Sequence, residues 1–495
     1  MDQLKKLVRQ AINKNQYTEY MLVNLAHHYL RRPYVEGEKI DIVFIFQSAS
    51  FWPSWESVWE ACNADYRFNP IMLLCDESLK EKTQFKTAQK FLIDKNIPFM
   101  HVNDVNLSDL NPHIIVIHTP YDGHRPRYLY GKRLSSLGYR TVYIPYGIEI
   151  SDIKKAREDH FTGGVTTTAW RIYTFSKDMI PYYKMFSPTG GEMVRSFGHP
   201  KFDHLNKEHF PSLPVDILER AKGRKVLLWK VHFPKKVNGK MITPSLDMYE
   251  KFLQSFGEYK NLFCVFMPHP KFFEEFARYK NAKNFKRKID ELENMIEFTE
   301  DDYRPVLLNC DYYIIDRSAL MIEAGITGKP ILYISNKSPE VMTIPVQRIV
   351  DSYYQASSFG EMVEFMSKVV ILDNDYLKDS RMEEFESVMP KADGDSGYKI
   401  VEDMATSLRN ETSKELNNDS ISRSEFRQVI EDFSQKKELY DAKIEIEKQR
   451  FKQYLSYKLG KDMIESTRKP LGLFKLPFAL RKSYLEFKHS KPKSE

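Results

Sequence analysis

Short apolar runs alternate with longer amphipathic stretches along most of the chain, from about residue 39 to residue 370. In the first half of this region the runs have the length of strands buried on both faces, and helical spacing fills the gaps. The predicted strands are Ile42–Phe46, Ile71–Leu74, Phe99–Val102, Ile114–His118, Thr141–Ile144, Arg171–Phe175 and Val194–Phe197, and the predicted helices are Trp55–Asn63, Gln84–Asp94 and Arg127–Leu137. This alternation is typical of a parallel sheet covered by helices on both faces.

A second alternating series begins at Lys225. Its predicted strands are Val226–Trp229, Leu262–Met267, Met295–Phe298, Asp311–Ile315, Ile331–Ile334 and Val346–Val350, and its helices are Leu246–Phe256, Lys271–Tyr279, Arg304–Asn309, Ser318–Ile326 and Phe359–Val370. The fold class is therefore α/β, with two Rossmann-like domains in series. Such domains place their strand ends across a shared cleft, where a nucleotide-activated donor meets an acceptor.

The 495 residues leave room for two or three domains and additional segments. The expected organisation is an N-terminal helix (1–37), an acceptor-side domain (38–210), a donor-side domain (211–408), a polar linker (409–423) and a helical, basic, amphipathic tail (424–495). Four cysteines without paired or metal-ligand spacing indicate small core residues in a reducing compartment: Cys62, Cys75, Cys264 and Cys310.

The positive charge is concentrated at the C-terminal end. Residues 450–495 carry twelve Lys and Arg against four Asp and Glu, a net charge of +8. The whole chain has a net charge of +6, so the net charge of the other residues is −2. Apolar residues at helical spacing between 473 and 487 favour either an interfacial helix on an anionic membrane or docking on the protein's own body. With no run of about 20 apolar residues and no secretory signal, we expect a cytoplasmic protein, peripheral on the inner face of the plasma membrane, that binds no nucleic acid.

The clearest candidate site lies in the stretch DYYIIDRSALMIEAGITGKPILYI, residues 311–334. Asp316, Arg317 and Ser318 fall where a strand ends and a helix begins, and Glu323 follows on that helix. In parallel sheets this is where anionic ligands bind. The alternative is an ordinary βαβ unit in which Ser318 only caps the helix.

Further polar residues follow other predicted strands. Pro268-His269-Pro270-Lys271 holds a His and a Lys in a rigid backbone, suited to a diphosphate. His232 ends the first strand of the second series and should face the cleft. In the first series the corresponding side chains are His118, Asp122 and Tyr146, whereas Lys201 and Asp203 fit a turn into the linker.

Taken in order, these motifs resemble the CDP-glycerol glycerophosphotransferase family, whose bacterial members build teichoic acids and related capsule polymers. The resemblance spans roughly residues 40–408 and rests on Gly198-His199-Pro200, Pro268-His269-Pro270-Lys271 and Asp316-Arg317-Ser318. It implies a GT-B fold, no metal or other cofactor, and transfer of an alditol phosphate from a CDP-linked donor to a hydroxyl of a lipid-linked or polysaccharide acceptor.

Carried over by position, the resemblance assigns His269 to catalysis and Lys271, Asp316, Arg317, Ser318 and Glu323 to the donor diphosphate. Arg317 and Ala319 depart from the family's Asp-Tyr-Ser-Ser segment, and Tyr146 stands where the family has the histidine proposed as base. Tyrosine is a poor base at neutral pH. His118, Asp122, His124 or His232 would then take this role. A nucleotide-sugar glycosyltransferase and an inactive donor-binding subunit remain alternatives.

Overall fold

The computed structural model describes residues 30–411, apart from residues 76–81, 188–189, 238–239, 242, 245, 301, 337–340 and 390–393, together with residues 480 and 482. The chain divides into two compact units, Tyr20–Asn418 and a second unit made of Met1–Glu19 and Asp419–Glu495. All features discussed below belong to the first unit. Most of the predicted N-terminal helix (1–37), linker (409–423) and tail (424–495) lies outside the described residues; only residues 30–37, 409–411, 480 and 482 of these segments are described.

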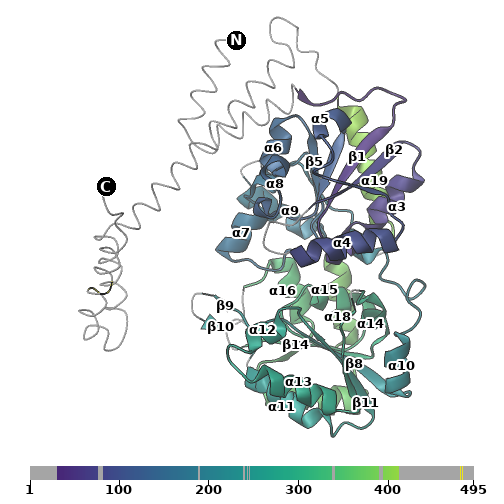
Figure 1. The fold of residues 1–495 in the computed structure, drawn as a ribbon. Helices are drawn as coiled ribbons and strands as arrows, with labels where there is room; N and C mark the ends of the chain where they lie inside the picture. Colours follow the sequence, from purple (N-terminus) through teal and green to yellow (C-terminus); the bar gives the residue numbers. More distant parts are fainter. Residues whose placement is uncertain are drawn as a thin grey trace, which may run out of the picture. The chain divides into compact units, whose positions relative to one another are not determined.

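The N-terminal domain is built on a parallel sheet of seven strands, in the order β3-β2-β1-β4-β5-β6-β7 (Figure 1). The strands are β1 (Ile40–Phe46), β2 (Phe68–Leu74), β3 (Phe99–His101), β4 (Ile114–Ile117), β5 (Arg140–Tyr143), β6 (Arg171–Tyr173) and β7 (Val194–Arg195). The helices between them are η1 (Ala49–Ser54), α3 (Glu56–Ala64), α4 (Lys82–Asp94), α5 (Leu107–Leu110), η2 (Asp122–His124), η3 (Arg127–Leu129), α6 (Gly131–Ser136), α7 (Lys154–His160), α8 (Gly164–Thr168), η4 (Lys177–Met179) and α9 (Ile180–Phe186).

The C-terminal domain has a parallel sheet of six strands, in the order β12-β11-β8-β13-β14-β15. The strands are β8 (Lys225–Val231), β11 (Leu262–Pro268), β12 (Met295–Glu297), β13 (Tyr312–Ile315), β14 (Ile331–Ile334) and β15 (Tyr354–Ala356), and a small hairpin pairs β9 (Lys236–Val237) with β10 (Lys240–Met241). Between the two sheets the chain forms η5 (Pro200–Phe202) and α10 (Val215–Ala221). The helices that follow β8 in the chain are α11 (Leu246–Phe256), α12 (Phe272–Phe276), α13 (Ala282–Glu291), α14 (Arg304–Asn309), α15 (Leu320–Glu323), η6 (Ala324–Thr327), α16 (Ile344–Asp351), α17 (Phe359–Phe365), η7 (Met366–Ile371), α18 (Lys378–Val388) and α19 (Ser396–Asn410).

One predicted strand is wrong. Residues 346–350 belong to the helix α16, and the sixth strand of the sheet is β15. Val346, Ile349 and Val350 are buried at helical spacing, and Pro345 occupies the first turn, where its fixed φ and missing N–H are tolerated. So short an apolar run is compatible with the spacing of a strand and with that of a helix, and in the structure it is helical.

The last described helix, α19, packs on the N-terminal domain and not on the domain that precedes it in the chain. Figure 1 shows α19 in light green among the purple and blue elements, beside α3. Ile400, Met404 and Leu408 are buried in the same apolar cluster as Trp59. The helix α19 therefore contributes to the apolar core of the N-terminal domain.

Asp203 fixes the start of α19. Its carboxylate accepts hydrogen bonds from the backbone N–H groups of Ser396 (3.1 Å) and Gly397 (2.7 Å) and from the hydroxyl of Ser57 (2.6 Å). A Cβ at position 397 would lie 2.6 Å from the carbonyl carbon of Ser57, so only glycine permits this approach. Asp203 is thus a buried anchor between α3 and α19.

A short antiparallel contact links the N-terminal loop after β5 to the segment before α16. Ser151 pairs with Met342, and backbone hydrogen bonds join Asp152 N–H to Val341 O (2.9 Å) and Thr343 N–H to Ile150 O (2.8 Å). These bonds hold the loop after β5 against the C-terminal domain.

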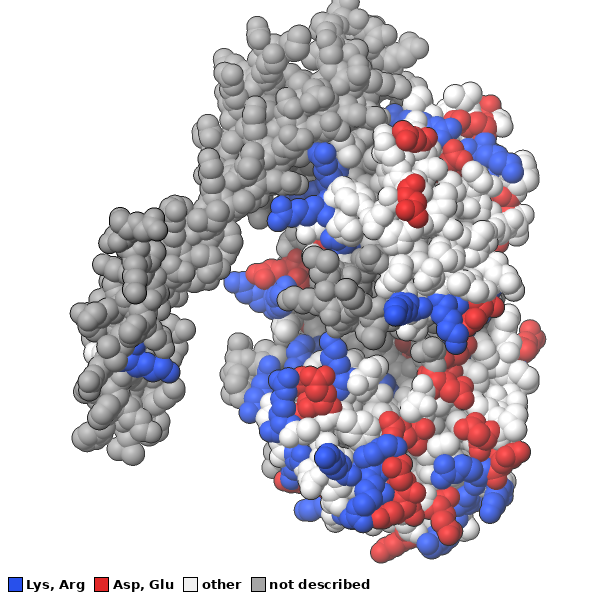
Figure 2. All heavy atoms as spheres, viewed as in Figure 1, with Lys and Arg blue, Asp and Glu red and all other residues white. Residues whose placement is uncertain are grey.

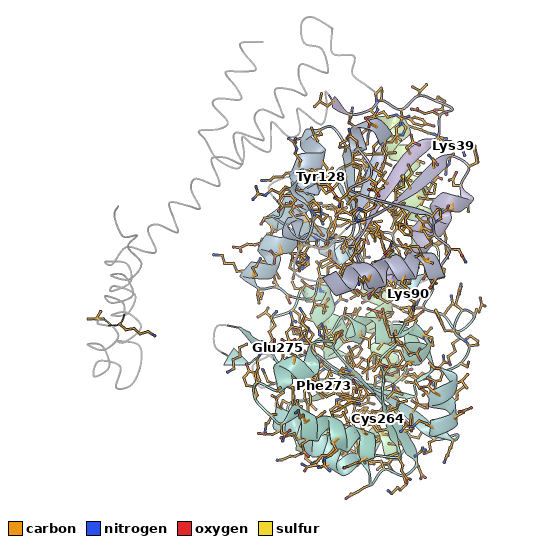
Figure 3. The ribbon with its side chains drawn as sticks, in the orientation of Figure 1. Lys39, Lys90, Tyr128, Cys264, Phe273 and Glu275 are labelled. Atoms are coloured by element: carbon orange, nitrogen blue, oxygen red, sulfur yellow. The ribbon has the colours of Figure 1, made fainter. Side chains whose placement is uncertain are left out.

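The four cysteines are free and buried, as predicted, and Cys264 is labelled on β11 in Figure 3. None of the helices in the described part of the chain has the length and apolar character needed to cross a membrane.

Candidate functional site

The chain order of the C-terminal sheet reverses between two central strands, β8 and β13. From β8 the chain continues to β11 on one side, and from β13 it continues to β14 on the other, so the connections diverge at this point. Ligands of open α/β sheets bind in the crevice beyond the strands at such a switch point. His232 directly follows β8, and Asp316 directly follows β13. His269 follows the neighbouring β11, so the sequence motifs converge on one edge of the sheet.

Asp316 is fully buried and serves the protein's own hydrogen bonds. Both of its oxygens accept from the backbone N–H of His232 at 2.8 Å, and Oδ2 also accepts from the hydroxyl of Tyr249 at 2.6 Å. Burial raises the pKa of Asp316 to about 6, against the effect of these hydrogen bonds. Asp316 therefore holds the loop after β8 in place, and its contact with a donor diphosphate stays a prediction.

This raised pKa predicts a specific pH dependence of stability. The ordinary value is 3.8, so between about pH 4 and pH 6 the folded protein binds the proton more tightly than the unfolded chain does. The contribution of Asp316 is present at pH 4 and is lost as the pH rises through 6. Asp316→Asn keeps an acceptor for Tyr249 and cannot titrate. The free energy of unfolding, measured with urea, should therefore fall less steeply between pH 4.5 and 7 for Asp316→Asn than for wild type. Equal slopes for the two proteins would contradict the assignment.

The two imidazoles of His232 and His269 lie side by side, with ring centroids 4.9 Å apart. Burial lowers the pKa of His232 to about 3, and burial with the charges of Lys230 and Lys271 lowers that of His269 to about 4. Both rings are therefore neutral at pH 7, and their hydrogen bonds define the tautomers. In His269, Nδ1 accepts from the Lys271 backbone N–H (3.1 Å), so Nε2 carries the proton. In His232, Nδ1 donates to Phe233 O (3.0 Å), so Nε2 has the free lone pair.

The two rings thus have complementary capacities. His269 presents an N–H donor suited to a phosphate oxygen, and His232 presents an acceptor suited to a hydroxyl proton.

The remaining residues of the donor motif differ in their surroundings. Arg317 is half-buried and donates from Nη2 to Ser151 Oγ (2.6 Å), so it reaches the N-terminal loop after β5. Ser318 is half-buried and accepts from the backbone N–H of Leu320 (3.3 Å), a local turn contact; the N-cap position of α15 is Ala319, so Ser318 does not cap this helix. Lys271 is exposed.

Glu323 belongs to a buried interdomain ion pair. One of its oxygens accepts from Lys201 Nζ at 3.0 Å, and the other accepts from the hydroxyl of Tyr303. Both Glu323 and Lys201 are buried. Glu323 therefore ties η5 to α15, and Lys201, which the sequence placed in a simple turn, is its partner.

On the N-terminal side, Tyr146 is half-buried, and its ring lies 4.5 Å from that of Phe51. The Asp122 carboxylate accepts from Arg125 Nη2 (2.7 Å) and from the backbone N–H of Gly131 (2.8 Å), so it holds the start of α6.

His118 is fully buried, and burial lowers its pKa well below the ordinary value. Its ring lies 4.6 Å from both Phe51 and Trp55. These surroundings disfavour Asp122 and His118 as general bases; His124 is exposed.

The sequence reasoning gave no role to two residues of this region, Lys230 and Ser151, whereas it placed Tyr121 among the side chains that face the site. Lys230 lies on β8 near His269 and Asp316, whose pKa values respond to its charge. Tyr121 lies close enough to Tyr146 and Arg317 for both to affect its pKa, which burial raises. Of Lys230 and Ser151, only Lys230 carries a sequence signal, because it interrupts an otherwise apolar strand.

Exposed charges elsewhere are largely neutralised by neighbours. Figure 2 shows Lys and Arg intermixed with Asp and Glu over the C-terminal domain. On α13, for example, Lys286 pairs with Asp290 (2.7 Å) and Arg287 with Glu291 (2.6 Å). Solvated pairs of this kind contribute little to stability.

Several solved structures are similar to this chain. They include S. aureus MnaA in a co-structure with UDP (TM-score 0.55, 13% identity, 75% of this chain and 97% of that one) and a putative UDP-N-acetylglucosamine 2-epimerase from Listeria monocytogenes (0.55, 14%, 78% and 100%). The wall teichoic acid polymerase TagF is similar over 82% of this chain and 97% of its own (0.51, 11%). The fold is therefore that of the GT-B enzymes, as the sequence predicted.

Sequence comparison is informative only for the C-terminal quarter. Residues 377–495 match the family described as Domain of unknown function (DUF8374), which includes α18, α19 and the tail. No curated protein matches the sequence.

Proposed function

We propose that this protein is a transferase of cell-surface polymer synthesis that moves an alditol phosphate from a CDP-linked donor to a hydroxyl acceptor. The observation that carries the proposal is the convergence of His232, His269 and Arg317 at the switch point of the C-terminal sheet. The sequence resemblance supports the CDP-linked donor. The likeness to TagF supports a fold that suits the reaction.

In the proposed reaction the acceptor oxygen forms a bond to the β-phosphorus, and the bond from that phosphorus to the bridging oxygen breaks. CMP leaves with the electron pair. The Nε2–H of His269 and the guanidinium of Arg317 stabilise the charge on the diphosphate oxygens. His232 Nε2 accepts the hydroxyl proton, and Tyr146 orients the acceptor. Phosphoryl transfer passes through a loose transition state, so positioning and charge stabilisation outweigh a strong base.

The test is a panel of CDP-glycerol, CDP-ribitol and UDP-N-acetylglucosamine with a soluble hydroxyl acceptor, followed by phosphorus-31 NMR of the products. A new phosphodiester signal together with CMP supports the proposal. A glycoside with release of UDP indicates a glycosyltransferase that uses the same diphosphate site. Conversion of the UDP-sugar to its epimer without acceptor indicates an isomerase. Donor binding without any turnover indicates a binding subunit.

The tail supports a second part of the proposal, location at the inner face of the plasma membrane, where a lipid-linked acceptor is available. This rests on the basic, amphipathic sequence between residues 450 and 495, which lies outside the described residues apart from two positions. Sedimentation with anionic liposomes at low salt tests it. Binding that is lost at high salt and absent from a chain ending at residue 459 supports the location, and indifference to the liposomes overturns it.

A further inference from the structure

We propose that the side chain of Lys230 binds the diphosphate group of the nucleotide donor. The inference rests on the proposed function, since it assumes a donor that contains a nucleoside diphosphate. It assigns a role to a residue to which neither the sequence motifs nor the resemblance gave one.

Lys230 occupies the central strand of the C-terminal sheet, one residue before β8 ends. Its neighbours Met267 on β11 and Ile315 on β13 are paired with it across the sheet. Side chains alternate along a strand, and Val226 and Leu228 belong to the apolar cluster on one face. Lys230 is on that same face, where the alternation of side chains along β8 predicts a third apolar residue. The position next to the switch point explains why a lysine stands there.

The titratable groups that interact electrostatically with Lys230 come from several neighbouring segments. They are Asp316 after β13, Glu323 on α15, His232 after β8 and His269 after β11. Asp316 is engaged by His232 and Tyr249, and Glu323 by Lys201 and Tyr303. Among the described residues, no carboxylate oxygen lies within 4.0 Å of the Lys230 ammonium.

A half-buried ammonium without a hydrogen-bonded partner is costly, because it loses water and gains no direct contact. Burial accordingly lowers the pKa of Lys230 to about 8, in spite of the two carboxylates. Proteins keep a buried charged residue of this kind at sites where a ligand supplies the missing hydrogen-bond partner. An anionic diphosphate held by His269 and Arg317 would place its oxygens beside this ammonium.

The same strand provides a matched control at its other end. Lys225 is exposed and pairs with Asp373 (2.6 Å), away from the switch point. Titration calorimetry with CDP should show at least about tenfold weaker binding for Lys230→Met, since one charge-assisted hydrogen bond is lost, and unchanged binding for Lys225→Met. Lys230→Arg should recover part of the affinity. If Lys230→Met binds CDP as wild type does, the inference is overturned.

Chemical labelling of the wild-type protein keeps the inference testable if Lys230→Met does not fold. At pH 8 an acylating reagent modifies lysines with a lowered pKa first, and mass spectrometry gives the rate at each site. CDP should slow acylation of Lys230 at least about tenfold and leave Lys225 unaffected; equal rates with and without CDP overturn the inference. If wild type binds neither CDP nor UDP, the proposed function fails instead.

Discussion

A His269→Ala variant should transfer about 100-fold more slowly than wild type and melt at the same temperature. The loss is that expected when one donor to a developing negative charge is removed. The variant loses the hydrogen bond from the Lys271 N–H to His269 Nδ1 (3.1 Å), but the fold should survive because two backbone hydrogen bonds also hold this loop. The His269 N–H donates to Val231 O (2.8 Å), and His269 O accepts from the Phe272 N–H (2.7 Å). The measurement is the rate of CMP release under saturating donor, with thermal melting in parallel.

His209→Ala is the matched control for this experiment, because His209 is exposed and contacts His204 and Asn206 rather than the candidate site. It should leave the rate of CMP release unchanged. Near-normal turnover in His269→Ala would remove His269 from the chemistry.

A Lys201→Ala variant should lower the free energy of unfolding by about 3–5 kcal/mol, because it leaves the buried carboxylate of Glu323 without its cation. The measurement is denaturant unfolding at pH 7. Lys90→Ala is the control: Lys90, labelled in Figure 3, makes an exposed pair with Asp94 at 3.9 Å, and its loss should cost less than about 1 kcal/mol.

The double variant Lys201→Met with Glu323→Gln separates charge burial from packing. It removes both charges and keeps an acceptor for the Tyr303 hydroxyl, so it should recover part of the lost stability. A loss for Lys201→Ala no larger than that for Lys90→Ala would show that the ion pair contributes little to the stability of the folded protein.

The sequence predicted both sheets because strands buried on two faces leave continuous apolar runs. The bounds of α11, α14 and β14 agree with the prediction to the residue. The three-residue strand β15 was too short to produce a recognisable run. The placement of α19 was not predictable, because its partner α3 lies more than 300 residues earlier in the chain.

The candidate site was predictable in location but not in orientation. Strand ends of a parallel sheet meet at one edge, so the motifs containing His269 and Asp316 had to approach each other. Which polar groups face a ligand depends on distant partners. Tyr249, which binds Asp316, is 67 positions away, and Lys201, which binds Glu323, is 122 positions away. No local pattern contains that information.

The position of α19 also bears on how the chain matures on the ribosome. The apolar side of α3 around Trp59 is complete only when Ile400 and Met404 have been synthesised. At about 5–20 residues per second, the stretch from residue 210 to residue 410 takes about 10–40 s to translate. For that interval the nascent N-terminal half presents an uncovered hydrophobic surface, which makes it a natural client of ribosome-associated chaperones. A gene cut between the two sheets would release this half with the same surface permanently uncovered, so we expect it to aggregate unless α19 is supplied.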